Sequence, residues 1–99
     1  MEKYNFAFPQ GETISFEGEY LGGLKKFLGR LDMAVYQTED TYVVVLSRSL
    51  EPQRWFEYHT SEELIEFMLG SIAQVGYELT GVKTDTLGER ELQEFLKQL

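Results

Sequence analysis

The sequence predicts an α+β domain: an antiparallel sheet of about four to five strands over residues 3–60, followed by two to three C-terminal helices packed on one face. Three observations support this prediction. β-prone runs fill the first part of the chain, two capping-box patterns follow them, and helical spacing of apolar residues begins after residue 60. The 99 residues are the length of a single domain, residues 1–99.

The segment Met33 to Arg48 is predicted to be the β-hairpin around which the sheet is organised. It contains three consecutive valines, which are stiff at χ1 and favour a strand. The continuous apolar run from Tyr42 to Leu46 predicts a central strand that is covered on both faces. A two-residue loop at Glu39–Asp40 would place Tyr36 opposite Val43.

The remaining strands are indicated by alternating polar and apolar residues. Residues 4–8 and Thr13 to Tyr20 form a predicted hairpin joined by a turn at Pro9 to Glu12, and Arg54 to Thr60 reads as a further antiparallel strand. Leu21 to Asp32 combines helical spacing with glycines that weaken a helix. We interpret it as a strand extension or an irregular turn of helix.

Helix start and stop signals then follow. Thr60-Ser61-Glu62-Glu63 is a capping box, Gly70 is expected to end or kink the helix, and Gly81 is a candidate C-terminal cap. The segment Tyr77 to Val82 could be helix or an added strand. Thr86-Leu87-Gly88-Glu89 is a second capping-box pattern, which opens a predicted amphipathic final helix.

Composition narrows the class of protein. Hydrophobic residues make up 42% of the chain and are interrupted by charge throughout, which indicates a soluble globule without a membrane span. Cysteine is absent, so disulfides, thiolate catalysis and cysteine-bound zinc are excluded. No secretory signal pattern opens the sequence, and a cytoplasmic location is expected. We expect no cofactor and no metal.

The net charge of −8 is concentrated in the second half, where residues 51 to 99 carry 10 acids against 4 bases. Nucleic-acid phosphates attract lysine and arginine, so direct nucleic-acid binding is not expected. Between Arg54 and Lys83 the chain has no lysine or arginine. This stretch also contains Glu78 and predicts an acidic patch that binds a basic protein partner; the acids predicted to contact the partner are Glu57, Glu62, Glu63 and Glu66.

Two further candidates come from the strand that precedes the first helix. His59 is the only histidine and has acidic neighbours, but no metal-binding or nucleophile motif surrounds it, so a structural role is favoured. Trp55 beside Arg54 is a candidate contact patch, because tryptophan and arginine dominate interface hot spots. The alternative for Trp55 is a place in the core of the sheet.

Two functional hypotheses result. The first is a small non-enzymatic interaction protein that presents its acidic face to a basic partner, with an inhibitor that occupies a nucleic-acid site as one form. In size and charge alone, the chain is similar to the small acidic inhibitors made by phages and mobile elements. The second is a small-molecule-binding or weakly enzymatic domain that uses the Trp55 and His59 face. Homo-oligomerisation is left open by the sequence.

Overall fold

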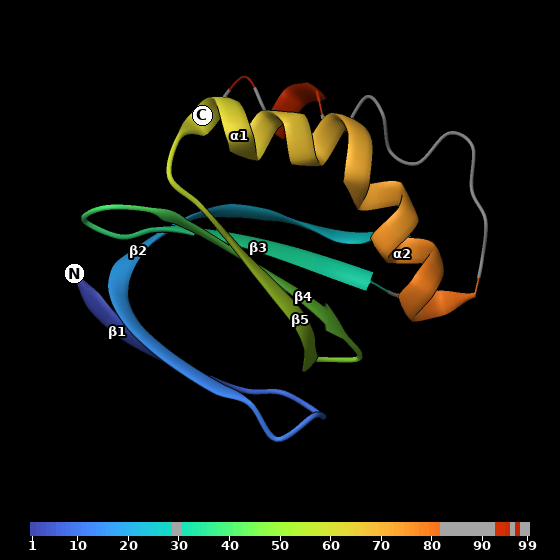
Figure 1. Cartoon of the computed structure of the whole chain (residues 1–99), viewed down its shortest axis with the longest axis horizontal. Coiled ribbons are helices and arrows are strands. Elements are labelled where there is room, and N and C mark those ends of the chain that lie inside the picture. The colour runs from blue at the N-terminus through green and yellow to red at the C-terminus, as the bar shows by residue number, and fades with distance from the viewer. Residues whose placement is uncertain (29–30, 82–92, 96, 98–99) are drawn as a thin grey trace.

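The sheet contains five strands, and every neighbour in the sheet is also a neighbour in the sequence. The computed structural model describes residues 1–28, 31–81, 93–95 and 97, with backbone only for residues 26–28. All strand pairs are antiparallel, which confirms the predicted sheet (Figure 1). The strands are β1 (Glu2–Ala7), β2 (Thr13–Leu28), β3 (Leu31–Gln37), β4 (Tyr42–Arg48) and β5 (Glu51–Tyr58).

The long strand β2 gives the sheet its curl. Its first part pairs with β1 and its second part, from Glu19 onward, pairs with β3. Register shifts after Tyr20 and after Leu24 break the second pairing, and Gly22 lies between them at a φ of 148°. For the segment Leu21 to Asp32, the strand extension is therefore correct over residues 21–28, and the alternative helical turn is wrong there; residues 29–30 lie outside the described residues. The glycines of this segment therefore lie in a bulged strand.

The central hairpin has the predicted register. Tyr36 pairs with Val43 and Val35 pairs with Val44. Thr38 and Thr41 close the loop, since the Thr38 N–H donates to the Thr41 carbonyl at 2.8 Å. The predicted register is thereby confirmed, and residues 38–41 connect the two strands.

One long helix follows the sheet in the described part of the chain, whereas the sequence predicts two to three helices. It consists of α1 (Ser61–Glu66), the π-helical segment η1 (Phe67–Ser71) and α2 (Ile72–Thr80). Gly70 does not end the helix, because it lies inside the π-helical segment and the chain continues helically to Thr80. Tyr77 to Thr80 is therefore helical. Gly81 is the C-terminal cap, with a left-handed φ of 72° and its N–H bonded to the Tyr77 carbonyl at 2.7 Å.

Only part of the predicted final helix lies among the described residues. Its capping-box residues 86–89 lie outside the described residues, whereas residues 93–95 and 97 have helical conformation. Phe95 is buried and packs at Gly22 of β2. The C-terminal segment thus contributes a side chain to the core.

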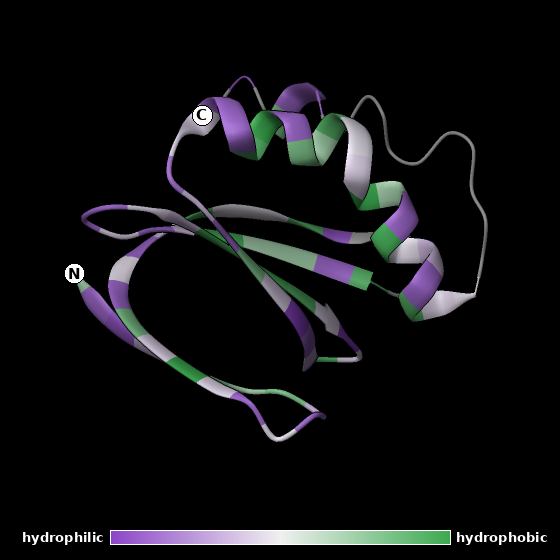
Figure 2. Cartoon of the chain, viewed as in Figure 1, coloured by the Kyte–Doolittle hydropathy of each residue, from purple (hydrophilic) through white to green (hydrophobic). Residues whose placement is uncertain are grey.

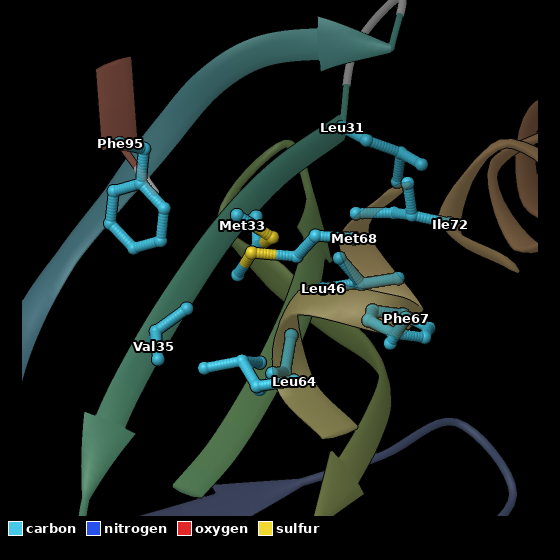
Figure 3. Close-up of a cluster of buried hydrophobic side chains, with 10 residues drawn as sticks. Leu31, Met33, Val35, Leu46, Leu64, Phe67, Met68, Ile72 and Phe95 are labelled. Atoms are coloured by element: carbon cyan, nitrogen blue, oxygen red, sulfur yellow. The ribbon is translucent and has the colours of Figure 1, made fainter. Parts of the chain in front are cut away.

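The long helix packs on one face of the sheet and forms the first core (Figure 3). Apolar residues of β3 and β4 contact the buried stripe of the helix there. The buried members of the first core are Leu31, Met33, Val35, Val44, Leu46, Leu64, Phe67, Met68, Ile72 and Phe95.

The opposite face of the sheet holds a second core. The β1–β2 hairpin lies across β3 to β5 on the side away from the helix (Figure 1). Phe8, Tyr36, Val43 and Val45 are buried there, and aromatic residues of the hairpin pack against them. Strand β4 is therefore covered on both faces, as predicted from its continuous apolar run. β4 is an interior strand, although β3 is the middle one.

Candidate functional site

The acidic residues predicted to bind a partner lie at two places. Glu62, Glu63 and Glu66 are exposed together on α1. Glu57 is also exposed, but its place in β5 puts it on the face of the second core. There its Oε2 accepts a hydrogen bond from Thr41 Oγ1 at 3.0 Å. The structure therefore brings three of the four predicted acids together.

Glu63 has a structural task in addition to its charge. The Glu63 N–H donates to Thr60 Oγ1 at 3.1 Å, and its carboxylate accepts from the His59 N–H at 3.3 Å. These two bonds form the predicted capping box, except that the Glu63 carboxylate accepts from the N–H of His59 and not from that of the N-cap residue Thr60. Glu62 and Glu66 have no such role in the cap, so they are the better residues for testing partner binding.

A hollow of about 250 Å³ adjoins this acidic group, and we call it the α1 hollow. Tyr58 and Phe67 contribute aromatic rings whose centroids are 5.3 Å apart. Burial, and next the charge of Glu63, raise the pKa of the Tyr58 hydroxyl. Two carboxylates beside aromatic rings suit a lysine or arginine side chain. The lining residues are Tyr58, Glu63, Glu66, Phe67 and Ser71.

Arg54 and Trp55 do not form one patch, because consecutive residues of β5 face opposite sides of the sheet. Arg54 lies on the helix side, where its guanidinium pairs with the Glu78 carboxylate of α2 at 2.7 Å. That contact holds the pKa of Glu78 below its usual range. Trp55 lies on the other side, where its Nε1–H donates to Glu12 Oε1 at 2.6 Å and links β5 to the β1–β2 turn.

Two large apolar side chains of the long helix face solvent. Leu69 is 64% exposed and Tyr77 is 47% exposed. Hydrophilic and hydrophobic residues alternate along this helix (Figure 2). Single exposed apolar residues are common in soluble proteins, so these two gain interest only from their place on the acidic helix.

A second hollow, of about 600 Å³, lies where β1, β2 and β3 meet on the second-core side, and we call it the tyrosine cup. Tyr4, Tyr20 and Tyr36 come from these three strands. Burial raises the pKa of Tyr36, and the neighbouring Tyr4 and Tyr20 hydroxyls add to the shift. The lining residues are Met1, Glu2, Tyr4, Gly18, Glu19, Tyr20 and Tyr36. Sequence reasoning missed this site; the placement of all three tyrosines at inward positions of successive strands was the available signal.

His59 lies exposed between β5 and α1, and neither hollow includes His59 or Trp55 in its lining. Over the described ranges, no group of three histidine, aspartate or glutamate side chains is placed to hold a metal ion. None of the helices in that part of the chain is long and apolar enough to cross a membrane. The exposed carboxylates of α1 and the two hollows are therefore the candidate sites.

Comparison with known proteins adds no functional assignment. No protein-family model, no curated protein and no solved structure matches this chain. The function must accordingly be argued from the two hollows and their surroundings.

Proposed function

We propose that the protein is a non-enzymatic interaction protein that binds a basic protein partner through the acidic face of α1. The observation that carries this proposal is the α1 hollow, in which Glu63 and Glu66 stand beside the rings of Tyr58 and Phe67. A lysine or arginine side chain of the partner would enter the hollow. Its aliphatic stem would lie along the rings while its charge meets the carboxylates.

The charge of the surrounding helix supports this choice of partner. The long helix carries four glutamates and no lysine or arginine. Glu78 is neutralised by Arg54, but Glu62 and Glu66 are one helical turn apart and repel each other. A partner with positive charge relieves this repulsion and is attracted over several ångströms before contact.

The exposed apolar residues extend the same face. Leu69 would supply a desolvated contact next to the acidic end of the helix, and Tyr77 would supply another further along, in α2. An interface with apolar anchors and charged surroundings has the usual composition of protein–protein contacts. Glu57, which faces the other side of the sheet, lies outside this proposed interface.

The proposal includes a mode of action for a partner that binds nucleic acid. Carboxylates on α1 would occupy the lysine and arginine side chains that otherwise contact phosphates. The protein would then act as an inhibitor by mimicking the charge of a nucleic acid, in the manner of phage and mobile-element inhibitors. The alternative, a ligand site at Trp55 and His59, is less favoured because neither hollow lies there.

Reversal of two charges on α1 tests the proposal. In the double variant Glu62→Lys/Glu66→Lys, affinity for a fluorescent oligoarginine peptide at low salt should fall by at least about tenfold. Glu63 is left intact because its loss would also weaken the helix cap. Fluorescence anisotropy measures the binding, and urea unfolding confirms that the variant is folded.

A matched double variant controls for net charge. Glu17→Lys/Glu51→Lys makes the same change in charge at exposed positions outside both hollows, and should reduce affinity by less than about threefold. Equal losses in the two double variants would show that net charge alone attracts the peptide, and the α1 face would be wrong. In pull-downs from host lysate, the variant Glu62→Lys/Glu66→Lys should no longer capture the natural partner. Added nucleic acid should compete with the unmodified protein for that partner.

A further inference from the structure

The tyrosine cup lies on the opposite side of the sheet from α1. Its volume of about 600 Å³ falls within the range of small-molecule sites. The proposed protein-binding face does not use any of its residues. Its chemistry therefore requires a separate explanation.

Three aromatic rings form the cup. Tyr36 lies at the base, since it is only 8% exposed and both other rings pack against it. The ring centroid of Tyr36 is 4.6 Å from that of Tyr4 and 5.5 Å from that of Tyr20, at interplanar angles of 52° and 56°. Tyr20 is 56% exposed, so one wall of the cup is open to solvent. The three tilted rings therefore line one hollow together.

Gly18 lies in the lining of the cup. It is buried and pairs with Glu2 across the β1–β2 ladder. This pair lies between the Tyr4–Phe16 pair and the Tyr20–Tyr36 pair. A Cβ atom at this position would lie 2.6 Å from the Gln37 carbonyl oxygen, so a larger residue cannot be placed there without moving β3. Gly18 thus lets β3 approach β2 closely at the lining of the cup.

The cup is negatively polarised. The Tyr4 hydroxyl donates to Glu2 Oε2 at 3.1 Å, which fixes a carboxylate beside the rings, and Glu19 lines the same space. The faces of aromatic rings carry negative electrostatic potential. Of the seven lining residues only Met1 can carry positive charge, at its amino group. Anionic ligands are therefore disfavoured and cations are favoured.

We propose that the tyrosine cup binds a methylated ammonium group, through cation–π contacts with Tyr4, Tyr20 and Tyr36 and through the charge of Glu2. A quaternary ammonium is bulky and weakly hydrated, and several ring faces around one space are the usual way to bind it. An unmethylated ammonium is compact and strongly hydrated, so it loses more hydration on entry. The cup is larger than the cationic group, which leaves room for the rest of the ligand toward the open wall.

Choline and its neutral carbon isostere, 3,3-dimethyl-1-butanol, test the proposal as a pair of probes of equal shape. Titration of the intact protein followed by NMR shifts of the tyrosine rings should show choline binding at least about fivefold more tightly, because only choline carries the charge that the rings attract. Equal affinity of the two probes would overturn the proposal.

Substitution of Tyr20 provides the structural test, because this ring is exposed and is not itself a member of the buried core. Tyr20→Leu should weaken choline binding by about three- to tenfold, and Tyr20→Phe, which keeps the ring, should stay within about twofold of the unmodified protein. Unchanged binding in a folded Tyr20→Leu variant would remove the cup from consideration. Glu62→Lys/Glu66→Lys should leave choline affinity unchanged, which separates this site from the α1 face.

The same assay distinguishes two sources of the ligand. A free small molecule is the source if choline binds as tightly as a peptide that contains trimethyllysine. A modified protein side chain is the source if the peptide binds at least about tenfold more tightly, because contacts along the peptide then add to those of the ammonium. Either result keeps the cation site, and a peptide with unmethylated lysine is the matched control.

Discussion

Val44 and Val45 offer a paired test of the two cores, because they are identical neighbours that face opposite sides of β4. Val44 is 0% exposed in the first core, and Val45 is 1% exposed in the second. Each Val→Ala change removes two buried carbon atoms, which amounts to about 1.6 kcal/mol of transfer free energy. The cavity adds to this cost, so we expect each variant to lose about 1.5–3 kcal/mol of unfolding free energy.

Urea unfolding measures the effect. With an m-value of about 1–1.5 kcal/mol/M, each variant should unfold at a midpoint about 1–3 M lower, with the m-value unchanged. Glu39→Ala, at an exposed position of the β3–β4 turn, is the control and should stay within about 0.5 kcal/mol of the unmodified protein. A loss in Val44→Ala without a loss in Val45→Ala would refute the packing of the β1–β2 hairpin on the sheet. Full stability of both variants would refute the placement of β4.

Two further predictions concern glycine and pH. Gly70→Ala should stabilise the protein by about 0.5–1 kcal/mol, because the residue is helical and a methyl group there meets nothing within 4 Å. Gly23→Ala should destabilise the protein by at least about 2 kcal/mol, because its Cβ would collide with the Met33 carbonyl oxygen. Differential scanning calorimetry compares the two. Because Arg54 lowers the pKa of Glu78 in the folded state, the contribution of this pair is present above the unfolded pKa and is lost as the pH falls through the folded value. Urea midpoints at neutral and acidic pH should therefore differ less in Glu78→Gln than in the unmodified protein.

Local patterns predicted the strands well. The run from Tyr42 to Leu46 indicated burial on both faces, and the register of Tyr36 against Val43 followed from the length of the loop. The curl of β2 could not be predicted in the same way. Which element covers the second face depends on contacts between distant residues, such as Trp55 with Glu12, that leave no periodic signal in the sequence.

The helix shows how tertiary packing overrides a local signal. Gly70 weakens a helix by about 1 kcal/mol, which made an end at this position reasonable. The buried side chains of Phe67, Met68 and Ile72 on the sheet contribute more than that, so the helix continues. The local widening to a π-helical segment absorbs one residue without losing those contacts.

The candidate sites were predictable to different extents. Exposed carboxylates near a capping box depend on local sequence, and Glu62, Glu63 and Glu66 lie as predicted on the first turns of α1. Arg54 and Trp55 are separated by strand alternation, which the sequence could have indicated. The tyrosine cup depends on three strands that meet only after the sheet curls, so no single segment contains its pattern.

The order of the strands has a consequence for the speed of folding. Since each strand pairs only with its neighbours in the chain, every ladder of the sheet can form as a hairpin without a long loop closure. Sheets with long-range pairing fold slowly because distant segments must first find each other. This chain avoids that search for all four strand pairs, and the longest sequence separations arise only when Trp55 meets the β1–β2 turn and Phe95 reaches β2. Closure of the second core and docking of the C-terminal segment are therefore the late events of folding.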